Sequence, residues 1–288
     1  MTTPSKSEEK VILITGCSSG IGYEVAKGLV ERGGYRVFAT ARQHKDVDRL
    51  NSEGLESLQL DLADSASIRS AVNELLARTD GKLYALFNNG AYGQPGAVED
   101  LSREVLREQF EVNFLGTHEL TCLVLPIMRA QGEGRIIQNS SVLGLITLKY
   151  RGAYNASKFA LEGLSDTLRM ELKGSGLAVS LIEPGPIVSR FRANAFAAFQ
   201  KNIDSEKSPH RQLYRTVEKR LASEEGEAPF TLGPEAVLRR VIHALESDRP
   251  KARYYVTFPT YLFAFLRRIL PVSLLDKILI RTSGFENR

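Results

Sequence analysis

The chain has few of the residues that build several common kinds of site. It contains two cysteines, Cys17 and Cys122, four histidines and no tryptophan in 288 residues. Two cysteines are too few for a disulfide scaffold, and the histidines lie too far apart to share a helix face or turn as metal ligands. With no signal peptide ahead of the first apolar run, at Val11, the sequence predicts no metal site and a reducing, cytoplasmic location.

Long tracts of one charge are also absent. The net charge is +4, and because acidic and basic residues alternate through most of the chain, nucleic acid is not an expected partner. Residues 233–288 are the exception, with ten Lys or Arg against five Asp or Glu. The apolar stretch 261–280 is interrupted by Arg267, Arg268 and Pro271, so it is a poor bilayer-spanning segment. Three interpretations of this tail stay open: contact with an anionic membrane, closure over the active site, and ordinary amphipathic packing.

What is present is a regular alternation of apolar strands and amphipathic helices. Strands are predicted at 11–14, 35–39, 55–60, 83–88, 135–139, 178–183 and 253–258, and helices between them, such as 21–33 and 151–173. This alternation predicts one α/β domain over 10–258, a Rossmann-like doubly wound parallel sheet of about seven strands. A frayed segment at 1–9 precedes it and an amphipathic helical extension at 259–288 follows. Residues 191–232 carry no strand pattern and are expected to form a lid or substrate loop.

A glycine-rich turn joins the first strand to the first helix and reads Thr15-Gly16-Cys17-Ser18-Ser19-Gly20-Ile21-Gly22. Glycines let a pyrophosphate approach free N–H groups and the positive helix end, although such turns also serve as simple connections. Where folds that bind NAD commonly have an acidic residue, about twenty residues further on, this chain has Arg42. Because a guanidinium can pair with a 2′-phosphate, the sequence favours NADP(H) over NAD(H), unless Arg42 is an ordinary solvated charge.

Tyr154 and Lys158 are four residues apart in a helical segment and therefore lie on one face, one turn from each other. Because an ammonium group favours a neighbouring phenolate, we expect Lys158 to lower the pKa of Tyr154 toward the range of a general acid or base. Tyr23 and Lys27 have the same spacing but no polar context, and we interpret that pair as packing and surface.

Two further polar residues accompany the Tyr154 pair. Ser141 ends the preceding strand and can hydrogen-bond a substrate carbonyl, while Asn113 can pass on a proton if it points at Lys158 through water. The alternatives are a turn-capping serine and a surface amide.

Together these motifs resemble the short-chain dehydrogenase/reductases. The resemblance covers residues 10–258 and rests on the glycine-rich turn, Asp61, Asn88-Asn89-Gly90, Asn113, Ser141, Tyr154 with Lys158, and Pro184-Gly185. The turn and Ala39-Thr40-Ala41-Arg42 are most similar to the 17β-hydroxysteroid and retinol dehydrogenase group. The segment from Phe230 to Glu235 is similar to a bacterial aldehyde reductase branch of that group.

The resemblance implies a role for each matching residue. Catalytic residues would be Asn113, Ser141, Tyr154 and Lys158; Ser141, Leu143 and Tyr154 would meet the substrate. Cofactor-binding residues would be Gly16, Ser18, Ser19, Gly20, Ile21, Gly22, Arg42, Asp61, Leu62, Asn88, Gly90, Tyr154, Lys158, Pro184, Gly185, Ile187 and Ser189. Members of the family commonly form homo-oligomers, so a dimer or tetramer is expected.

One motif departs from the family pattern. The usual Asn-Asn-Ala-Gly is here Asn88-Asn89-Gly90-Ala91, which puts the hydrogen bonds of this turn in question. The segments expected around the substrate are mainly apolar, so the sequence predicts an NADP(H)-dependent oxidoreductase of an apolar aldehyde or ketone and its alcohol, unless those side chains only pack the lid. The alternatives are a catalytically silent NADP(H)-binding sensor or scaffold, and an epimerase or dehydratase on the same scaffold.

Overall fold

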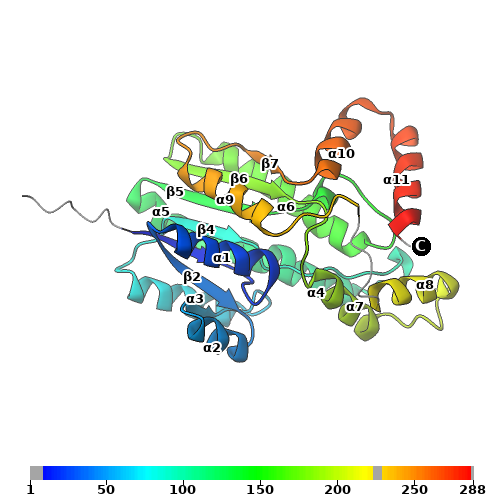
Figure 1. Ribbon diagram of the computed structural model, residues 1–288, viewed down its shortest axis with the longest axis horizontal. Helices are drawn as coiled ribbons and strands as arrows, with labels where there is room; N and C mark the ends of the chain where they lie inside the picture. Colours follow the sequence, from blue (N-terminus) through cyan, green and yellow to red (C-terminus); the bar gives the residue numbers. More distant parts are fainter. Residues whose placement is uncertain (1–8, 223–228, 287–288) are drawn as a thin grey trace, which may run out of the picture.

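The computed structural model describes residues 9–222 and 229–286 of the chain (Figure 1). Of the segment predicted to be frayed, residues 1–8 lie outside this described part. Seven strands form one parallel sheet in the order β3-β2-β1-β4-β5-β6-β7. They are β1 (Lys10–Ile14), β2 (Tyr35–Ala41), β3 (Glu56–Gln59), β4 (Ala85–Asn88), β5 (Gly134–Asn139), β6 (Leu177–Glu183) and β7 (Arg253–Tyr255). The predicted Rossmann-like fold is confirmed.

Helices cover both faces of the sheet, as the apolar strands require. They are α1 (Gly20–Arg32), α2 (His44–Ser52), α3 (Ser65–Arg78), α4 (Arg103–Phe110), α5 (Gly116–Gln131), α6 (Gly152–Glu171), α7 (Phe191–Asn202), α8 (Arg211–Ala222), α9 (Glu235–Glu246), α10 (Phe258–Ile269) and α11 (Val272–Glu286). Alternate residues of β1 serve the two layers: Ile12 and Ile14 pack with α1, α2 and α9, while Val11 and Leu13 pack with α3 and α5. Each face therefore has its own apolar core.

The chain reverses its direction of strand addition between β1 and β4. After β1 it adds β2 and β3 on one side, and it then returns to place β4 on the other side of β1. The carboxyl ends of the strands point toward the side on which α7, α8, α10 and α11 lie (Figure 1). Ligands of such sheets bind at this reversal, beyond the carboxyl ends of the strands.

The structure adds detail to the sequence-based description of the last third of the chain. The segment 191–232, predicted to be a lid or substrate loop, contains α7 and α8 within the described residues. The last strand ends at Tyr255, three residues before the predicted end, because Phe258 already begins α10. The extension is two helices joined at Pro271. No helix within residues 9–222 and 229–286 is long and apolar enough to cross a membrane.

Candidate active site

The glycine-rich turn leaves the start of α1 open to an anion. Ser19 precedes the helix without capping it through its side chain, and the first turn of α1 holds no acidic residue. Gly16 and Gly20 have φ angles of +72° and +62°, which L side chains rarely adopt. The turn is therefore a cradle of backbone N–H groups at the positive end of a helix, which fits the pyrophosphate of a dinucleotide.

The third glycine of the turn is fixed by close contacts. A Cβ on Gly22 would lie 2.4 Å from the carbonyl oxygen of Gly16 and 2.6 Å from Nδ2 of Asn89. A Cβ on Gly20 would lie 3.0 Å from Cβ of Ser189, which comes from the segment after β6. The turn therefore meets β4 on one side and the predicted nicotinamide segment on the other.

A chain of hydrogen bonds joins this turn to Lys158. Nδ2 of Asn89 donates to the carbonyl oxygen of Thr15 (2.9 Å), and Oδ1 of Asn89 accepts from Nδ2 of Asn139 (2.9 Å). The ammonium of Lys158 donates to the carbonyl oxygen of Asn139 (2.7 Å). These hydrogen bonds fix the positions of four elements relative to one another: the ends of β1, β4 and β5, and the helix α6. Sequence reasoning missed Asn139, although it is the last residue of a strand and precedes Ser140-Ser141.

The transposed Gly90-Ala91 does not disturb the turn after β4. The backbone N–H groups of Asn89 and Gly90 donate to Oγ1 of Thr15 at 2.9 and 2.8 Å. A Cβ at Gly90 would lie 2.9 Å from Cδ1 of Leu62, so the missing methyl group leaves room that Leu62 occupies. The hydrogen bonds that the sequence put in question are therefore present.

Tyr154 has a polar neighbour, Ser141, on one side and a cluster of apolar side chains on the other. Its hydroxyl lies close enough to that of Ser141 for the serine to lower the pKa of the phenol. Oγ of Ser141 also accepts from the N–H of Leu143 (3.1 Å), so this serine caps the turn at 142–144 as well. The ring of Tyr154 meets Phe191 edge-on, with centroids 5.2 Å apart. The remaining wall of this apolar cluster is Leu143, Ile146, Phe263 and Leu279.

The predicted effect of Lys158 on Tyr154 is wrong for this structure. Burial raises the pKa of Tyr154 to about 12, against the lowering effects of the Ser141 hydrogen bond and the charge of Arg151. Burial also lowers the pKa of Lys158 to about 8, although the charge of Glu162 opposes this. Desolvation is the largest cause of both shifts, because both side chains are at most 9% exposed. Tyr154 is therefore a neutral phenol at pH 7.

Asn113 is buried, and its side-chain amide hydrogen-bonds to Tyr92 and Ser157. It lies in a π-helical turn between α4 and α5, and its Nδ2 donates to the carbonyl oxygen of Tyr92 (2.9 Å) and to Oγ of Ser157 (3.2 Å). Its Oδ1 accepts from the N–H of Tyr92 (3.1 Å). Asn113 thus fastens the loop after β4 to α6, one residue before Lys158. The surface-amide alternative is wrong, and a proton path through water stays a prediction.

The remaining predicted cofactor residues lie along the carboxyl edge of the sheet, with different exposure. Arg42 is exposed after β2, and its carbonyl oxygen accepts from Nε2 of Gln59 (3.0 Å). Asp61 is half-buried and accepts from the N–H of Ala63 (3.0 Å). The amide of Asn88 instead faces α5, where Nδ2 donates to Oγ1 of Thr121 (2.9 Å), so only its backbone can face a cofactor.

The segment after β6 passes over the same edge. The carbonyl oxygen of Pro184 accepts from the N–H of Val142 (2.8 Å), next to Ser141. Ile187 pairs with Leu232 in a short parallel bridge. A Cβ on Gly185 would lie 2.1 Å from Oγ1 of Thr257, so this glycine is needed for the approach to α10. The structure thus brings residues 184–189 beside both the glycine-rich turn and Ser141.

Sequence reasoning also missed Arg49, which supports the glycine-rich turn from α2. Its Nη2 donates to the carbonyl oxygen of Ser18 (2.7 Å), and its Nη1 donates to Glu53 (2.8 Å). No motif marks it, because an arginine at a helical position usually points to solvent. The comparison pair behaves as predicted: Lys27 forms a surface ion pair with Glu31 (3.8 Å), and hydrogen bonding to Glu53 raises the pKa of Tyr23.

Because burial disfavours the charged ammonium of Lys158, replacing this lysine with an uncharged residue should stabilise the protein. We expect Lys158→Met to raise the free energy of unfolding at pH 7 by about 1–3 kcal/mol. Between pH 8 and 10.5 the unfolded lysine binds a proton that the folded one has lost, so wild-type stability rises with pH in this window and the advantage of the variant shrinks. Urea unfolding from pH 7 to 10.5 measures this. Lys27→Met is the exposed control, and equal pH profiles for wild type and Lys158→Met would contradict the account.

The fold and the site define a class of protein. A doubly wound sheet places an uncapped glycine-rich helix start, a Ser–Tyr pair and a buried lysine at one edge, which is the equipment of a nicotinamide-dependent oxidoreductase. A family model of the short chain dehydrogenases matches residues 10–199. The chain belongs to this family of oxidoreductases, whose members act on CH–OH groups.

Individual relatives agree with this assignment. The chain is 46% identical over 274 residues to the uncharacterized oxidoreductase YbbO of Escherichia coli (strain K12), covering 95% of each chain. It is 33% identical to human 17-beta-hydroxysteroid dehydrogenase type 1, covering 86% of this chain and 77% of that one. The relation to the steroid and retinol dehydrogenase group is confirmed.

Solved structures show the same fold. A short-chain dehydrogenase from Streptomyces avermitilis has a TM-score of 0.75 and 27% identity, over 99% of this chain and 98% of that one. Other structures with this fold hold NADP in some cases and NAD in others.

Proposed function

We propose that this protein is an NADP(H)-dependent reductase of apolar aldehydes or ketones, with Tyr154 as the proton donor. The observation that carries the proposal is the position of Tyr154: its hydroxyl lies beside that of Ser141, and its ring packs within a cluster of apolar side chains. Two free cysteines, Cys17 and Cys122, support a reducing, cytoplasmic setting for the reaction.

The protein residues supply orientation and the proton. Ser141 holds the carbonyl oxygen of the substrate beside the Tyr154 hydroxyl, which donates its proton to that oxygen. When bound, the dihydronicotinamide supplies the hydride to the carbonyl carbon. With its raised pKa, Tyr154 is protonated at neutral pH, which is the state that a proton donor needs. Lys158 holds the ribose and, with a pKa of about 8, can return a proton to Tyr154.

The apolar wall indicates the substrate class. Leu143, Ile146 and Phe191 pack around the Tyr154 ring, and Phe263 and Leu279 close the cluster from α10 and α11. Against these apolar side chains a charged substrate would lose its hydration. An aliphatic or aromatic carbonyl compound gains by burial instead. In this proposal α10 and α11 close the substrate side of the site through Phe263 and Leu279.

The reaction can be tested by dinucleotide oxidation with a series of aldehydes. We expect kcat/KM with NADPH to rise with chain length from short to medium aliphatic aldehydes, by about threefold per buried methylene, and to be low for charged carbonyl compounds. Activity confined to small charged carbonyl compounds would contradict the substrate class.

The preference for NADP(H) has its own control variants in the same assay. Arg42→Ala should weaken NADPH binding by about tenfold or more with little effect on NADH, because it removes a charge-assisted hydrogen bond. Arg129→Ala, in the last turn of α5, should change neither. Equal losses for both dinucleotides in Arg42→Ala would remove the argument for NADP(H).

A further inference from the structure

One side of α10 presents apolar side chains to solvent. These are Phe258 (57% exposed), Tyr261 (49%), Leu262 (38%), Phe265 (60%) and Ile269 (55%). Their spacing of three, one, three and four residues places them along one side of the helix, and no charged residue lies among them. We call these five side chains the α10 face.

The opposite side of the same helix is already in use. Thr260, Phe263 and Ala264 are buried, and Phe263 belongs to the apolar cluster around Tyr154. The helix is therefore apolar on both sides while only one is covered, and helices of this kind are normally buried all round. Five neighbouring exposed apolar side chains form a contiguous patch, and patches of this kind mark interaction sites.

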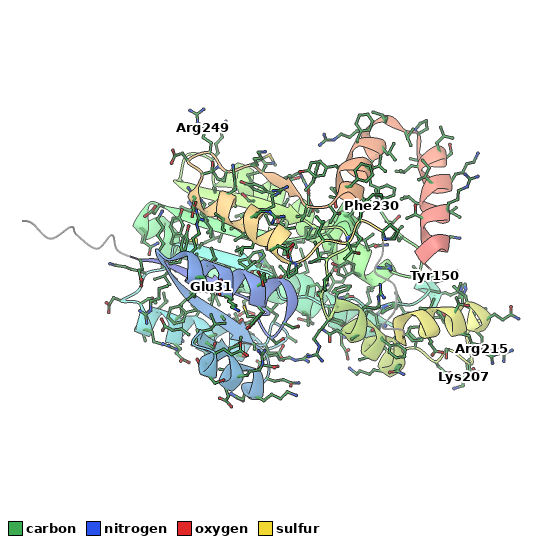
Figure 2. All side chains as sticks on the ribbon, viewed as in Figure 1. Glu31, Tyr150, Lys207, Arg215, Phe230 and Arg249 are labelled. Carbon is green, nitrogen blue, oxygen red and sulfur yellow. The ribbon has the colours of Figure 1, made fainter. Side chains whose placement is uncertain are left out.

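The α10 face continues toward the proposed nicotinamide segment. The ring of Phe230 (60% exposed) lies 5.1 Å from that of Phe258, and Figure 2 labels Phe230 next to α10. Two residues on, Leu232 is 39% exposed and pairs with Ile187, whose neighbour Val188 is 47% exposed. An apolar surface therefore leads from α10 to residues 187–188, in the segment that passes beside Ser141.

Arg268 borders this surface, while Arg267 lies on the opposite side of α10. Arg267 and Arg268, together with Arg253, line a cavity of about 250 Å³ between β7 and α10. Arg253 is neutralised by Glu162, Asp166 and Glu183. Within the described part of the chain, Arg267 and Arg268 have no carboxylate partner; Arg267 lies over the ring of Phe159. Lys277 and Arg281 on α11 are exposed as well.

We propose that the α10 face docks on the surface of a membrane that contains anionic phospholipid. Aromatic and aliphatic side chains on one face, with Arg268 at its border, match the acyl boundary and the phosphate layer of such a membrane. A twelve-residue helix is only about 18 Å long, too short for a hydrocarbon core of about 30 Å, so α10 lies in the plane of the interface. The charge complementarity favours an anionic lipid surface over an apolar protein partner.

Docking would set the active site toward the bilayer. This consequence rests on the proposed function: an apolar aldehyde or ketone dissolved in the membrane would reach Tyr154 along the surface formed by Phe258, Phe230 and Leu232. The docking itself is independent of any turnover, and binding is measured without substrate or dinucleotide.

The test is co-sedimentation of the full-length protein with vesicles. We expect binding to phosphatidylcholine vesicles that contain a third of phosphatidylglycerol, weaker binding to pure phosphatidylcholine, and loss of the difference at high salt. The double variant Phe258→Ser with Phe265→Ser should bind at least about tenfold more weakly. Met170→Ser, which changes a 63% exposed side chain on α6, is the matched control and should bind like wild type.

A second pair of variants tests the charge and leaves the apolar face intact. Arg268→Glu should weaken binding to the anionic vesicles by about fivefold or more, since each basic residue near the surface contributes about 1 kcal/mol. Arg249→Glu reverses an exposed charge that Figure 2 shows far from α10, and it should have no comparable effect. Retained NADPH binding in each variant shows that it is folded.

Three results would overturn the proposal. One is failure of the wild-type protein to bind either kind of vesicle. Another is equal loss in the α10 variants and in their controls. The third is a dimer by light scattering that dissociates in the Phe258→Ser, Phe265→Ser variant, because a second copy of the chain would then occupy the α10 face. Absence of reductase activity would leave the binding result standing and would count against the proposed function alone.

Discussion

Replacing Tyr154 with Phe is expected to lower carbonyl reduction by about 10²- to 10⁴-fold while leaving NADPH binding within a few-fold of wild type. The change removes one hydroxyl, which is the group that the site holds against Ser141, and it keeps the ring that packs on Phe191. Turnover is measured as carbonyl-dependent NADPH oxidation, and binding by fluorescence titration of NADPH. The variant should also fold, because the apolar contacts of the ring remain.

The chain offers a matched control for this prediction. Tyr23 precedes Lys27 by the same four residues on α1, but its hydroxyl partner is Glu53 at the surface. Tyr23→Phe should retain turnover. Unchanged reduction in Tyr154→Phe would remove the proposed mechanism. A wild-type protein that binds NADPH without any turnover would indicate a sensor or scaffold, and conversion of a substrate without net NADPH consumption would indicate an epimerase or dehydratase.

Gly22→Ala is expected to weaken NADPH binding by about tenfold or more and to lower the free energy of unfolding by about 1–3 kcal/mol. The new methyl group would lie 2.4 Å from the carbonyl oxygen of Gly16 and 2.6 Å from Nδ2 of Asn89, and neither group can withdraw without breaking the turn. Because Asn89 leads through Asn139 to Lys158, the disturbance reaches the lysine as well. Titration with NADPH and urea unfolding measure the two effects.

A second glycine separates this steric effect from a general effect of alanine. Gly163, inside α6, has no atom within 4 Å of the position a Cβ would take. Gly163→Ala should therefore stabilise the protein by about 0.5–1 kcal/mol through helix propensity and leave NADPH binding unchanged. If Gly22→Ala bound NADPH as tightly as wild type, the glycine-rich turn would not be the pyrophosphate cradle.

The fold could be predicted from the sequence because its signals are local. Apolar runs alternate with helical periodicity from Val11 to Tyr255, and this alternation leaves few arrangements other than a parallel sheet covered on both faces. The boundary between the last strand and α10 depends on competing local signals. Phe258 has strand propensity after a short β-branched run, yet Pro259 favours the first turn of a helix, and α10 begins there.

The identity of the site residues could be predicted, but their electrostatics could not. The spacing of the glycines and of Tyr154 and Lys158 can be read directly from the sequence, because it depends only on which residue stands at which position. The pKa of Tyr154 depends on burial by Phe191, Phe263 and Leu279, which lie far along the chain and come together only in the fold. The sequence therefore suggested a lowered pKa where the structure raises it.

Backbone partners were also invisible in the sequence. Lys158 donates to the carbonyl oxygen of Asn139, and every residue has such a carbonyl group. The sequence also does not show that the π-helical turn aims the side-chain amide of Asn113 at the backbone of Tyr92. Turns of this kind have no clear sequence signature, since they depend on the packing of α4 and α5 against α6.

The most direct measurement of the central claim is a crystal structure of the protein with its dinucleotide bound. The account predicts that the hydroxyl of Tyr154 faces the nicotinamide ring, with Ser141 beside it and room for one carbonyl oxygen between them. A phenol that points away from the ring, beyond hydrogen-bond reach of any carbonyl placed on it, would contradict the account.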